Sequence, residues 1–425
     1  MDLIVALLVL FVAARLAGEA MERIRQSPML GEVFAGIVLG PMLLGLVNPD
    51  PATELGASLG VIATLGVFVL VLLAGIELGR EGLRQALRER SIVVAYTEFV
   101  LPFALGYTLA AFMGLDFVQS LFLATAMAVT ALPVSVRILL DLNLLHSRLG
   151  RAIVSVALVN DLVAFAMLGL VLEFAQLGTD PAASSVGLVA LKTLLFLALI
   201  FCVAVLLKRT ALLTPGRMSP MQKALGRLRG AESSFALCVS LALFLGAAAE
   251  AVGIHFAVGV FYAGILITPQ LVGSEAFNQI RRSVSAVSFG LLTPIFFAFI
   301  GLRFSFSLTA WPIVVAVTGV AFAGKLLGGI LGGSIAGFRG APLLALGVGL
   351  NARGMMELLL AQVGLTAGII DVDLYSALVI MTIVTTFVTP PALKRLLRRF
   401  KAADVLPAAA TRAAPDHGLE TNGGS

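Results

Sequence analysis

The chain has 425 residues, of which 59% are hydrophobic and only 12% are Asp, Glu, Lys or Arg. Soluble domains carry about 25% charged residues, so this chain has too few polar groups to cover its apolar side chains in water. The composition predicts a polytopic membrane protein. It excludes a soluble enzyme, a nucleic-acid-binding protein and a disulfide-built secreted domain.

About thirteen apolar segments are long enough to cross a bilayer as helices, which takes about 20 residues each, and they predict an all-α fold. In chain order they are expected at 2–18, 29–47, 57–78, 91–114, 117–140, 148–175, 186–208, 232–251, 253–270, 283–302, 308–335, 341–368 and 373–393. No basic segment precedes the first, so we interpret it as a transmembrane helix and not as a signal peptide. The tail 402–425 is rich in Ala, Gly, Thr and Pro and is expected to be disordered.

The loops between these segments differ sharply in charge. Lys and Arg occupy the odd-numbered loops and the tail, whereas the even-numbered loops together contain only Arg303. Basic loops stay in the cytoplasm. The sequence therefore predicts an N-terminus outside and a C-terminus in the cytoplasm, in a cell (inner) membrane.

A few charges lie within the predicted spans, where they are costly and normally face a cavity or a partner. Asp161 lies about a dozen residues into the segment 148–175, which is near the midplane at 1.5 Å per residue. A carboxylate there can bind a monovalent metal ion (Na+ or K+) or a proton; the alternative is a structural ion pair. Lys325 is equally central, either locking two helices together or compensating charge, and Glu98 is a candidate partner for Lys325 or Arg353.

Two predicted spans contain sequence that interrupts a helix. In 117–140, Pro133 removes a backbone donor and disfavours helix at Leu132. In 341–368, Asn351 lies among several glycines. These spans are the fifth and the twelfth, so they cross the membrane in opposite directions. Two discontinuous crossing helices in this relation predict inverted repeats, the architecture with which secondary transporters build ion sites.

The remaining polar residues separate the candidate functions. Arg353 and Glu357 lie four residues apart on one helical face and are predicted to be charge-compensating. An intramembrane enzyme would need paired catalytic groups, but Asp161 is the only midplane aspartate and the three histidines are scattered. A Na+-coupled symporter of organic solutes would need more hydrogen-bonding groups near Asp161 than the sequence provides.

Several motifs resemble the monovalent cation:proton antiporter-2 family, in the form seen in plant cation/H+ exchangers and related bacterial antiporters. They are LGEVFAGIVLGPMLLG (30–45), the stretch 128–165, GKLLGGILGG (324–333) and NARGMMELLLAQVGL (351–365). The resemblance covers nearly the whole membrane part, with the motifs in the same order. It implies a sodium/proton antiporter fold and a homodimer surrounded by membrane lipids.

The resemblance also implies a division of the antiporter domain, residues 1–401. Ion-binding core helices are expected at about 91–175 and 308–393, and dimerisation or scaffold helices at about 1–78 and 186–302. No enzymatic activity, no cofactor beyond the transported ions, no nucleic acid and no nucleotide-binding regulatory domain in this chain are expected.

In the family, the acid at the position of Asp161 binds cation and proton alternately. The resemblance implies that Asn160 and Thr130 complete the oxygen shell and that Lys325 compensates charge. Many electrogenic relatives carry two consecutive aspartates where this chain has Asn160-Asp161. This departure favours one-to-one, electroneutral exchange. Residue identity does not distinguish Na+ from K+, because selectivity depends on cavity size and carbonyl spacing.

Overall fold

The computed structural model describes residues 2–24, 26–88, 91–130, 132–142, 144, 147–177, 233–252, 254–305 and 310–398, with short helical pieces between 191 and 206. Every regular element among the described residues is helical, as the sequence predicts. The predicted disordered tail 402–425 lies outside the described residues.

The helices follow one another along the whole described chain. They are α1 (Leu3–Arg23), α2 (Pro28–Leu39), α3 (Glu54–Arg88), α4 (Ser91–Phe112), α5 (Phe117–Ala128), α6 (Leu132–Asp141), α7 (Arg148–Leu177), α10 (Ser233–Ala251), α11 (Phe256–Leu266), α12 (Pro269–Val272), α13 (Ser274–Val287), the π-helical turn η1 (Ser288–Leu292), α14 (Thr293–Leu302), α15 (Trp311–Ile335), α16 (Gly340–Gly349), α17 (Met355–Thr366) and α18 (Val372–Arg398).

Eight helical segments of the described part are long and apolar enough to cross a membrane, and five shorter helices are also apolar. The predicted total of thirteen spans stays a prediction, because the span 186–208 is described only in pieces. Several predicted boundaries differ from the structure by a few residues, and two differences are larger than the others. Helix α3 continues to Arg88, beyond the predicted end at 78, and α13, η1 and α14 form one helical segment that begins before the predicted start at 283. In both cases charged, helix-favouring sequence extends an apolar span outwards.

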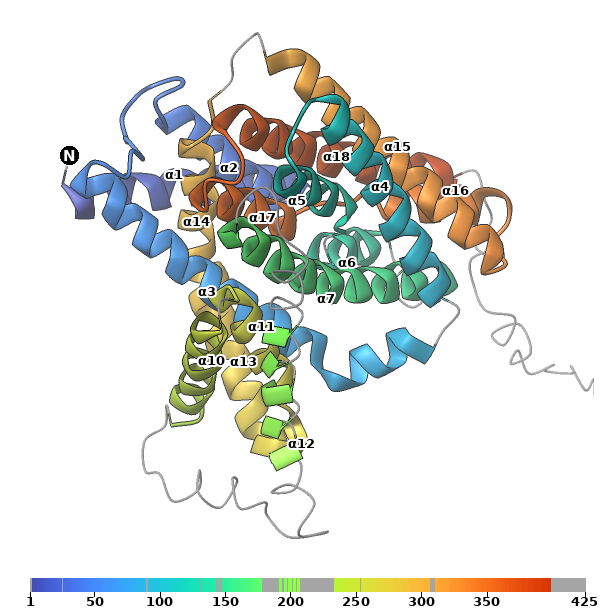
Figure 1. Cartoon of the computed structure of the whole chain (residues 1–425), viewed down its shortest axis with the longest axis horizontal. Helices are drawn as coiled ribbons and strands as arrows, with labels where there is room; N and C mark the ends of the chain where they lie inside the picture. Colours follow the sequence, from blue (N-terminus) through green and yellow to red (C-terminus); the bar gives the residue numbers. More distant parts are fainter. Residues whose placement is uncertain are drawn as a thin grey trace, which may run out of the picture.

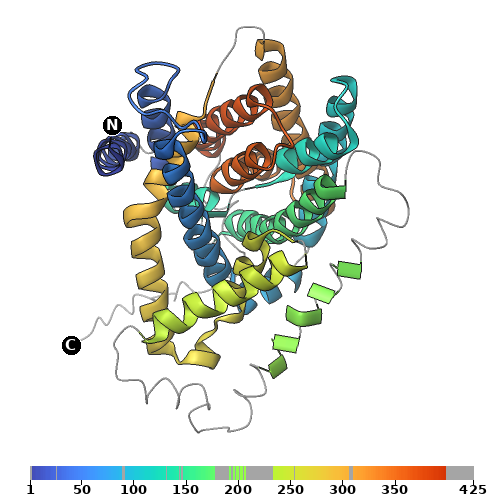
Figure 2. The same ribbon diagram turned by 60° about the vertical axis from the view of Figure 1, so that its left-hand side comes forward.

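The helices contact one another in two groups. Helices α4, α5, α6, α7, α15, α16, α17 and α18 form one, and α1, α2, α3, α10, α11, α13 and α14 form the other. In Figure 1, α10–α13 extend below the rest as a separate bundle joined to α3, and Figure 2 shows the same bundle from the side. The two groups meet mainly where α3 packs on α7 and α4 and where α11 packs on α7.

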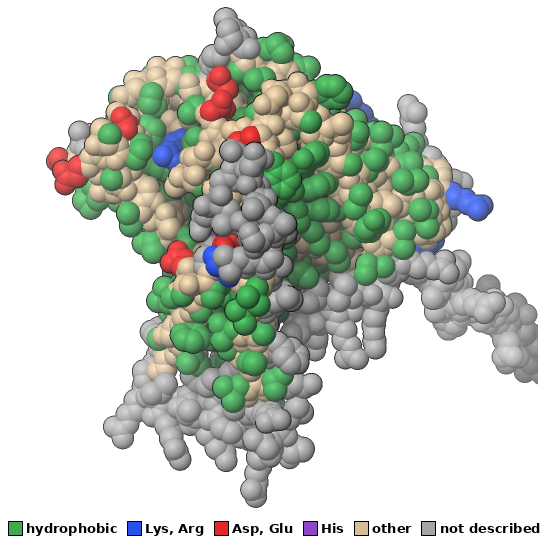
Figure 3. Space-filling view, in the orientation of Figure 1, with side chains coloured by type: hydrophobic (Ala, Val, Ile, Leu, Met, Phe, Trp, Pro, Cys, Tyr) green, Lys and Arg blue, Asp and Glu red, His purple; other side chains and the backbone are tan. Residues whose placement is uncertain are grey.

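The outer surface is apolar over wide areas. Figure 3 shows hydrophobic side chains spread across one face, with charged side chains confined to a few small places. On α1, the exposed side chains include Ile4, Leu8 and Leu16, which are 61–74% exposed. A surface of this kind is suited to lipid or to another apolar partner and not to water.

Glycines allow α15 to pack closely on α4. A Cβ atom on Gly328 would lie 2.8 Å from the carbonyl oxygen of Thr97 and 2.9 Å from Cα of Glu98. The hydroxyl of Thr97 donates to the carbonyl of Gly328 at 3.0 Å. Small residues at such a contact let two backbones approach. The approach matters because it brings Glu98 against the face of α15 that carries Lys325.

Replacing Gly328 with alanine is expected to destabilise the protein by about 1–3 kcal/mol, because the added methyl group must push α4 away from α15. Thermal unfolding of the purified protein in detergent measures this. Gly319→Ala is the matched control, because a Cβ atom at Gly319 of the same helix meets nothing within 4 Å. Equal melting temperatures for the two variants would contradict the packing argument.

Candidate functional site

The first helix interruption lies between α5 and α6. The chain leaves the helix after Ala128, runs through Val129 and Thr130 and becomes helical again at Leu132. Prediction from Pro133 put the break at Leu132 and Pro133, a few residues too late. The physical reason is that Pro133 is the second residue of α6, within the first turn, where a missing backbone N–H breaks no helical hydrogen bond.

The second interruption lies between Gly349 and Met355 and includes Asn351, as predicted. The amide of Asn351 donates to the carbonyl of Gly347 at 3.1 Å, which caps the end of α16. The two interruptions touch, because the hydroxyl of Thr130 lies 3.4 Å from the carbonyl oxygen of Leu350. Segments 220 residues apart in sequence thus meet at one place.

Beside this meeting point, Lys325 forms an ion pair with Glu98. The ammonium nitrogen lies 2.5 Å from Oε1 of Glu98, and both side chains are completely buried. Lys325 also donates to the hydroxyl of Thr130 at 2.5 Å and to the carbonyl of Ala128. Of the two partners that the sequence allowed for Glu98, the structure pairs it with Lys325.

Thr130 and Asn160 complete the hydrogen bonds of Glu98. Thr130 donates to Oε1 at 2.7 Å, and the amide of Asn160 donates to Oε2. The hydroxyl of Thr130 also accepts from Lys325 and, at 3.3 Å, from Asn160. A hydroxyl has one proton and two lone pairs, so Thr130 has no lone pair left for a cation. The structure places Thr130 in the network around the pair.

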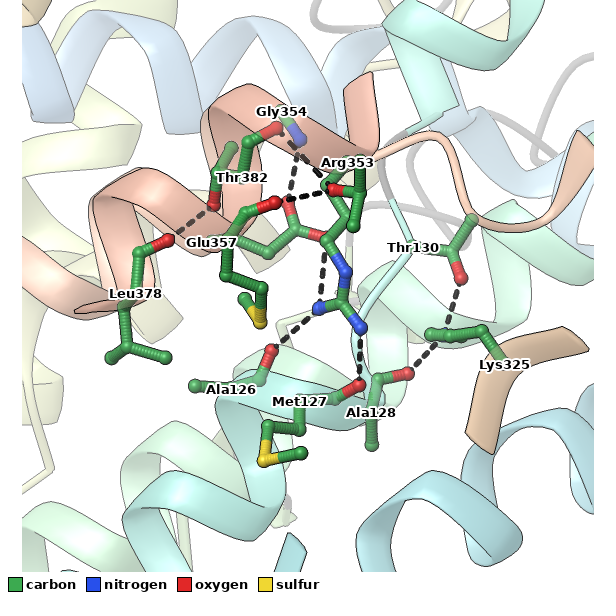
Figure 4. Close-up of polar contacts among 12 residues, drawn as sticks. Ala126, Met127, Ala128, Thr130, Lys325, Arg353, Gly354, Glu357, Leu378 and Thr382 are labelled. Atoms are coloured by element: carbon green, nitrogen blue, oxygen red, sulfur yellow. Dashed lines mark hydrogen bonds and ion pairs between the residues drawn. The ribbon is translucent and has the colours of Figure 1, made fainter. Parts of the chain in front are cut away.

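Arg353 holds the C-terminal end of α5. Its guanidinium donates to the carbonyl of Ala126 at 3.0 Å and to that of Met127 at 2.7 Å. Figure 4 shows Arg353 and Lys325 reaching the consecutive carbonyls of Ala126, Met127 and Ala128. Arg353 and Lys325 thus donate hydrogen bonds to the last carbonyls of α5, a helix that ends inside the protein. Their positive charges also stabilise the negative, C-terminal end of the helix dipole. Sequence reasoning missed this role of Arg353, because nothing local relates it to α5.

Glu357 lies one turn after Arg353 and is fully buried as well. Its Oε1 lies 3.9 Å from Nη1 of Arg353, and its Oε2 accepts the backbone N–H of Gly354 at 2.8 Å. The carboxylate therefore caps the start of α17 and balances the guanidinium charge. Oε1 has no hydrogen-bond donor among the described residues.

Arg353→Met is expected to destabilise the protein by about 3–5 kcal/mol. It leaves two buried carbonyls without donors and Glu357 without its counter-charge. Urea or thermal unfolding in detergent measures the loss. Arg339→Met removes an exposed arginine at the start of the neighbouring α16 and serves as the control. A loss no greater than that of the control would contradict the role of Arg353.

Asp161 lies in α7 directly after Asn160 and is 5% exposed. Its Oδ1 has no hydrogen-bond partner in the described part of the protein, and the same holds for Oδ1 of Asn160 and of Asn351. Glu357 and Lys325 are the charged groups that act on Asp161. A buried carboxylate without a partner is costly unless a cation or a proton accompanies it.

The buried charges near the interruptions balance except for one. Glu98 offsets Lys325, and Glu357 offsets Arg353. Asp161 is left with one unmatched negative charge among the charged side chains described here. One monovalent cation or one proton neutralises it. The arrangement can therefore accept either ion, one at a time.

Comparison with known proteins gives one family. The model for the transmembrane sodium/hydrogen exchanger matches residues 6–399. The chain is 30% identical to the Na+/H+-K+ antiporter GerN of Bacillus cereus, over 91% of this chain and 94% of that protein. It is 27% identical to a Na+/H+ antiporter of Enterococcus hirae, over 95% of this chain and all of that protein.

Longer relatives and a solved structure agree with this assignment. Cation/H+ antiporter 18 of Arabidopsis thaliana is 30% identical, with 94% of this chain matching 49% of that protein. Among solved structures, the sodium proton antiporter MjNhaP1 of Methanocaldococcus jannaschii superposes with a TM-score of 0.69 at 16% identity, over 93% of this chain and 97% of that one. That likeness confirms the predicted antiporter fold.

Proposed function

The chain belongs to the sodium/hydrogen exchanger family, and from that premise we propose that it exchanges Na+ or K+ for H+ across a membrane with Asp161 carrying each ion in turn. The observation that carries the assignment to Asp161 is its burial without a hydrogen-bonding partner for Oδ1. Cation and proton compete for the same oxygen, so binding of one releases the other.

Asn160 supplies a second oxygen for the cation in this proposal. Its amide nitrogen is committed to Glu98 and Thr130, which turns Oδ1 away from that network and leaves it free. Alkali cations prefer oxygen ligands, and carboxylate and amide oxygens suit them. In this proposal Thr130 does not bind the cation. Its hydrogen bonds hold Glu98, Lys325 and Asn160 in place.

Alternating access is supported by two cavities at the boundary between the helix groups. One cavity, which we call the inner cavity because the proposed orientation places it on the cytoplasmic side, has a volume of about 340 Å³. Its lining residues include Gln26, Met355 and Pro390. The outer cavity has about 460 Å³ and is lined by residues that include Pro51 and Thr366. Helix α17 runs from one cavity to the other. We propose that α4–α7 and α15–α18 move as the ion-carrying core against the remaining helices and open each cavity in turn.

The orientation and assembly are part of the proposal. The basic loops support an inner cavity that faces the cytoplasm of a cell whose inner membrane holds the protein. The exposed apolar face of α1 supports a homodimer in which a second copy, and not lipid alone, covers this helix. Mass measurement of the detergent-solubilised protein tests the dimer.

The charge balance supports one-to-one exchange. With Lys325 and Arg353 each matched by an acid, the core crosses the membrane neutral whether Asp161 carries one cation or one proton. A transported unit without net charge does no work against the membrane potential. The neutral side chain of Asn160 is part of this balance, because an aspartate there would add a negative charge.

Proteoliposomes with an internal pH dye test the function. Adding Na+ or K+ outside is expected to dissipate an imposed proton gradient, with a rate that does not change when an ionophore clamps the membrane potential at zero or at about 100 mV. A panel of Li+, Na+, K+ and Rb+ identifies the substrate. No dissipation with any cation would overturn the function, and a rate that follows the potential would overturn the stoichiometry.

A further inference from the structure

Glu32 is a buried carboxylate that lies outside the network around Asp161. Glu32 of α2 is 4% exposed and lines the inner cavity. No described residue donates a hydrogen bond to it or forms an ion pair with it. Arg15 of α1 is near enough to act on its charge, but Arg15 is exposed and donates to the carbonyl of Phe289 at 3.4 Å.

Glu32 has no structural task within its own helix. Helix α2 begins at Pro28 with Ser27 as its N-cap, so a capping carboxylate would be expected at position 30. Glu32 lies beyond that turn. Gly18 of α1 leaves room for it, because a Cβ atom on Gly18 would lie 3.3 Å from Cγ of Glu32 and 3.4 Å from its Oε1.

The same cavity contains a second unpartnered oxygen. Gln26 is 8% exposed and also lines the cavity; its amide nitrogen reaches the carbonyl of Phe387 at 3.5 Å, while its Oε1 is buried with no hydrogen-bond partner among the described residues. The cavity is thus lined by a carboxylate and by an amide oxygen without a donor, which match the ligand chemistry of an alkali cation, while the exposed guanidinium of Arg15, which also lines the cavity, donates to Phe289.

The wall of the cavity that faces the core helices lies next to the second helix interruption. It includes Met355, the first residue of α17, and Thr386 of α18, whose hydroxyl donates at 2.7 Å to the carbonyl of Arg353. The cavity therefore ends against the second helix interruption. Asn160 and Asp161 do not line this cavity, so an ion in it would lie between the solvent at the cavity mouth and their oxygens.

We propose that Glu32 and Gln26 form a second monovalent-cation site in the inner cavity, where the ion waits between the cytoplasm and Asp161. The site belongs to the scaffold helices, so it would stay in place while the core moves. This inference rests on the proposed exchange function. It adds a loading step that acts on one side of the membrane only.

Side-specific transport separates this step from exchange itself. In right-side-out and inside-out vesicles, we would measure the Na+ and K+ concentrations that give half-maximal exchange. Glu32→Gln is expected to raise this concentration about tenfold on one side, the cytoplasmic side, with the opposite side and the maximal rate unchanged, because one charged ligand is lost. Gln26→Leu is expected to shift the same side in the same direction by a smaller factor.

The control is Glu19→Gln. It removes an exposed carboxylate from the C-terminal end of α1, the end that packs near Glu32, and is expected to leave the half-maximal concentration unchanged on both sides. An unchanged half-maximal concentration for Glu32→Gln, or an equal shift on both sides, would overturn the second site. If Glu32→Gln does not fold, an unchanged value for Gln26→Leu overturns it. Absence of exchange in wild-type vesicles would overturn the proposed function instead, so the two failures are distinguishable.

Discussion

Asp161→Asn is expected to abolish cation/proton exchange while leaving the protein folded. The amide keeps the size of the side chain but can neither release a proton nor neutralise a cation. Oδ1 of Asp161 has no hydrogen bond in the described structure, so no contact of that atom is lost. We expect a loss of at least about 100-fold in the rate of exchange in proteoliposomes, with a melting temperature equal to or above that of the wild type.

Asp373→Asn is the matched control, because this acid lies in the first turn of α18, away from the interruptions. It is expected to exchange at the wild-type rate. Residual exchange by Asp161→Asn at more than a tenth of that rate would mean that another group carries the proton. Glu357 would then be the first group to test, because it is the other acid that acts on Asp161.

The sequence predicted those features of the site that depend on position within one span. Asp161 and Lys325 are charged residues within predicted spans, where a charge is costly unless it has a partner or a function. Both are buried in the structure. Asn351 lies in an interrupted helix because several glycines surround it in sequence. Each of these predictions needed the local sequence and the thickness of a membrane, and nothing more.

Features that depend on two spans could not be predicted in the same way. Glu98 and Lys325 are 227 residues apart, and only the packing of α4 on α15 brings them together. The hold of Arg353 on α5 is equally long-range. The assignment of Thr130 as a cation ligand followed from the resemblance alone, and the structure shows its lone pairs already in use. Periodicity places residues along a helix but does not show which neighbour they face.

The position of Glu32 also could not be predicted from its local sequence. In the sequence it is part of an apolar motif, LGEVFAGIVLG, and it lies four residues after the helix start. Nothing there distinguishes an acid that reaches the interface from one that faces a cavity. The distinction comes from α1, α6 and α18, which enclose it together with Gln26. Burial of a charge without a partner is therefore a more selective indicator than the presence of a charge in a span.

The ion pair of Glu98 and Lys325 is expected to show strong coupling in a double-mutant cycle. Lys325→Met leaves a buried carboxylate with hydrogen bonds but no counter-charge, and Glu98→Gln leaves a buried ammonium group, so each is expected to cost about 3–5 kcal/mol. The double variant removes both charges, and the single amide oxygen at position 98 can still accept from one of the two present donors, Thr130 or Asn160. It is expected to be more stable than the sum of the single losses predicts, by about 1–3 kcal/mol. Unfolding of all four proteins in one detergent measures the coupling, and additive losses would contradict it.

Exchange by the double variant then separates two roles of Lys325. Removing Lys325 alone changes the net charge of the buried cluster from one negative to two, whereas removing the pair keeps it at one. If the pair acts only through structure and charge balance, the double variant is expected to recover electroneutral exchange that Lys325→Met has lost. If the ammonium group itself takes part in proton release, exchange stays absent although stability returns. The comparison needs no assumption about which cation is carried, because the net charge at Asp161 is the same for Na+ and for K+.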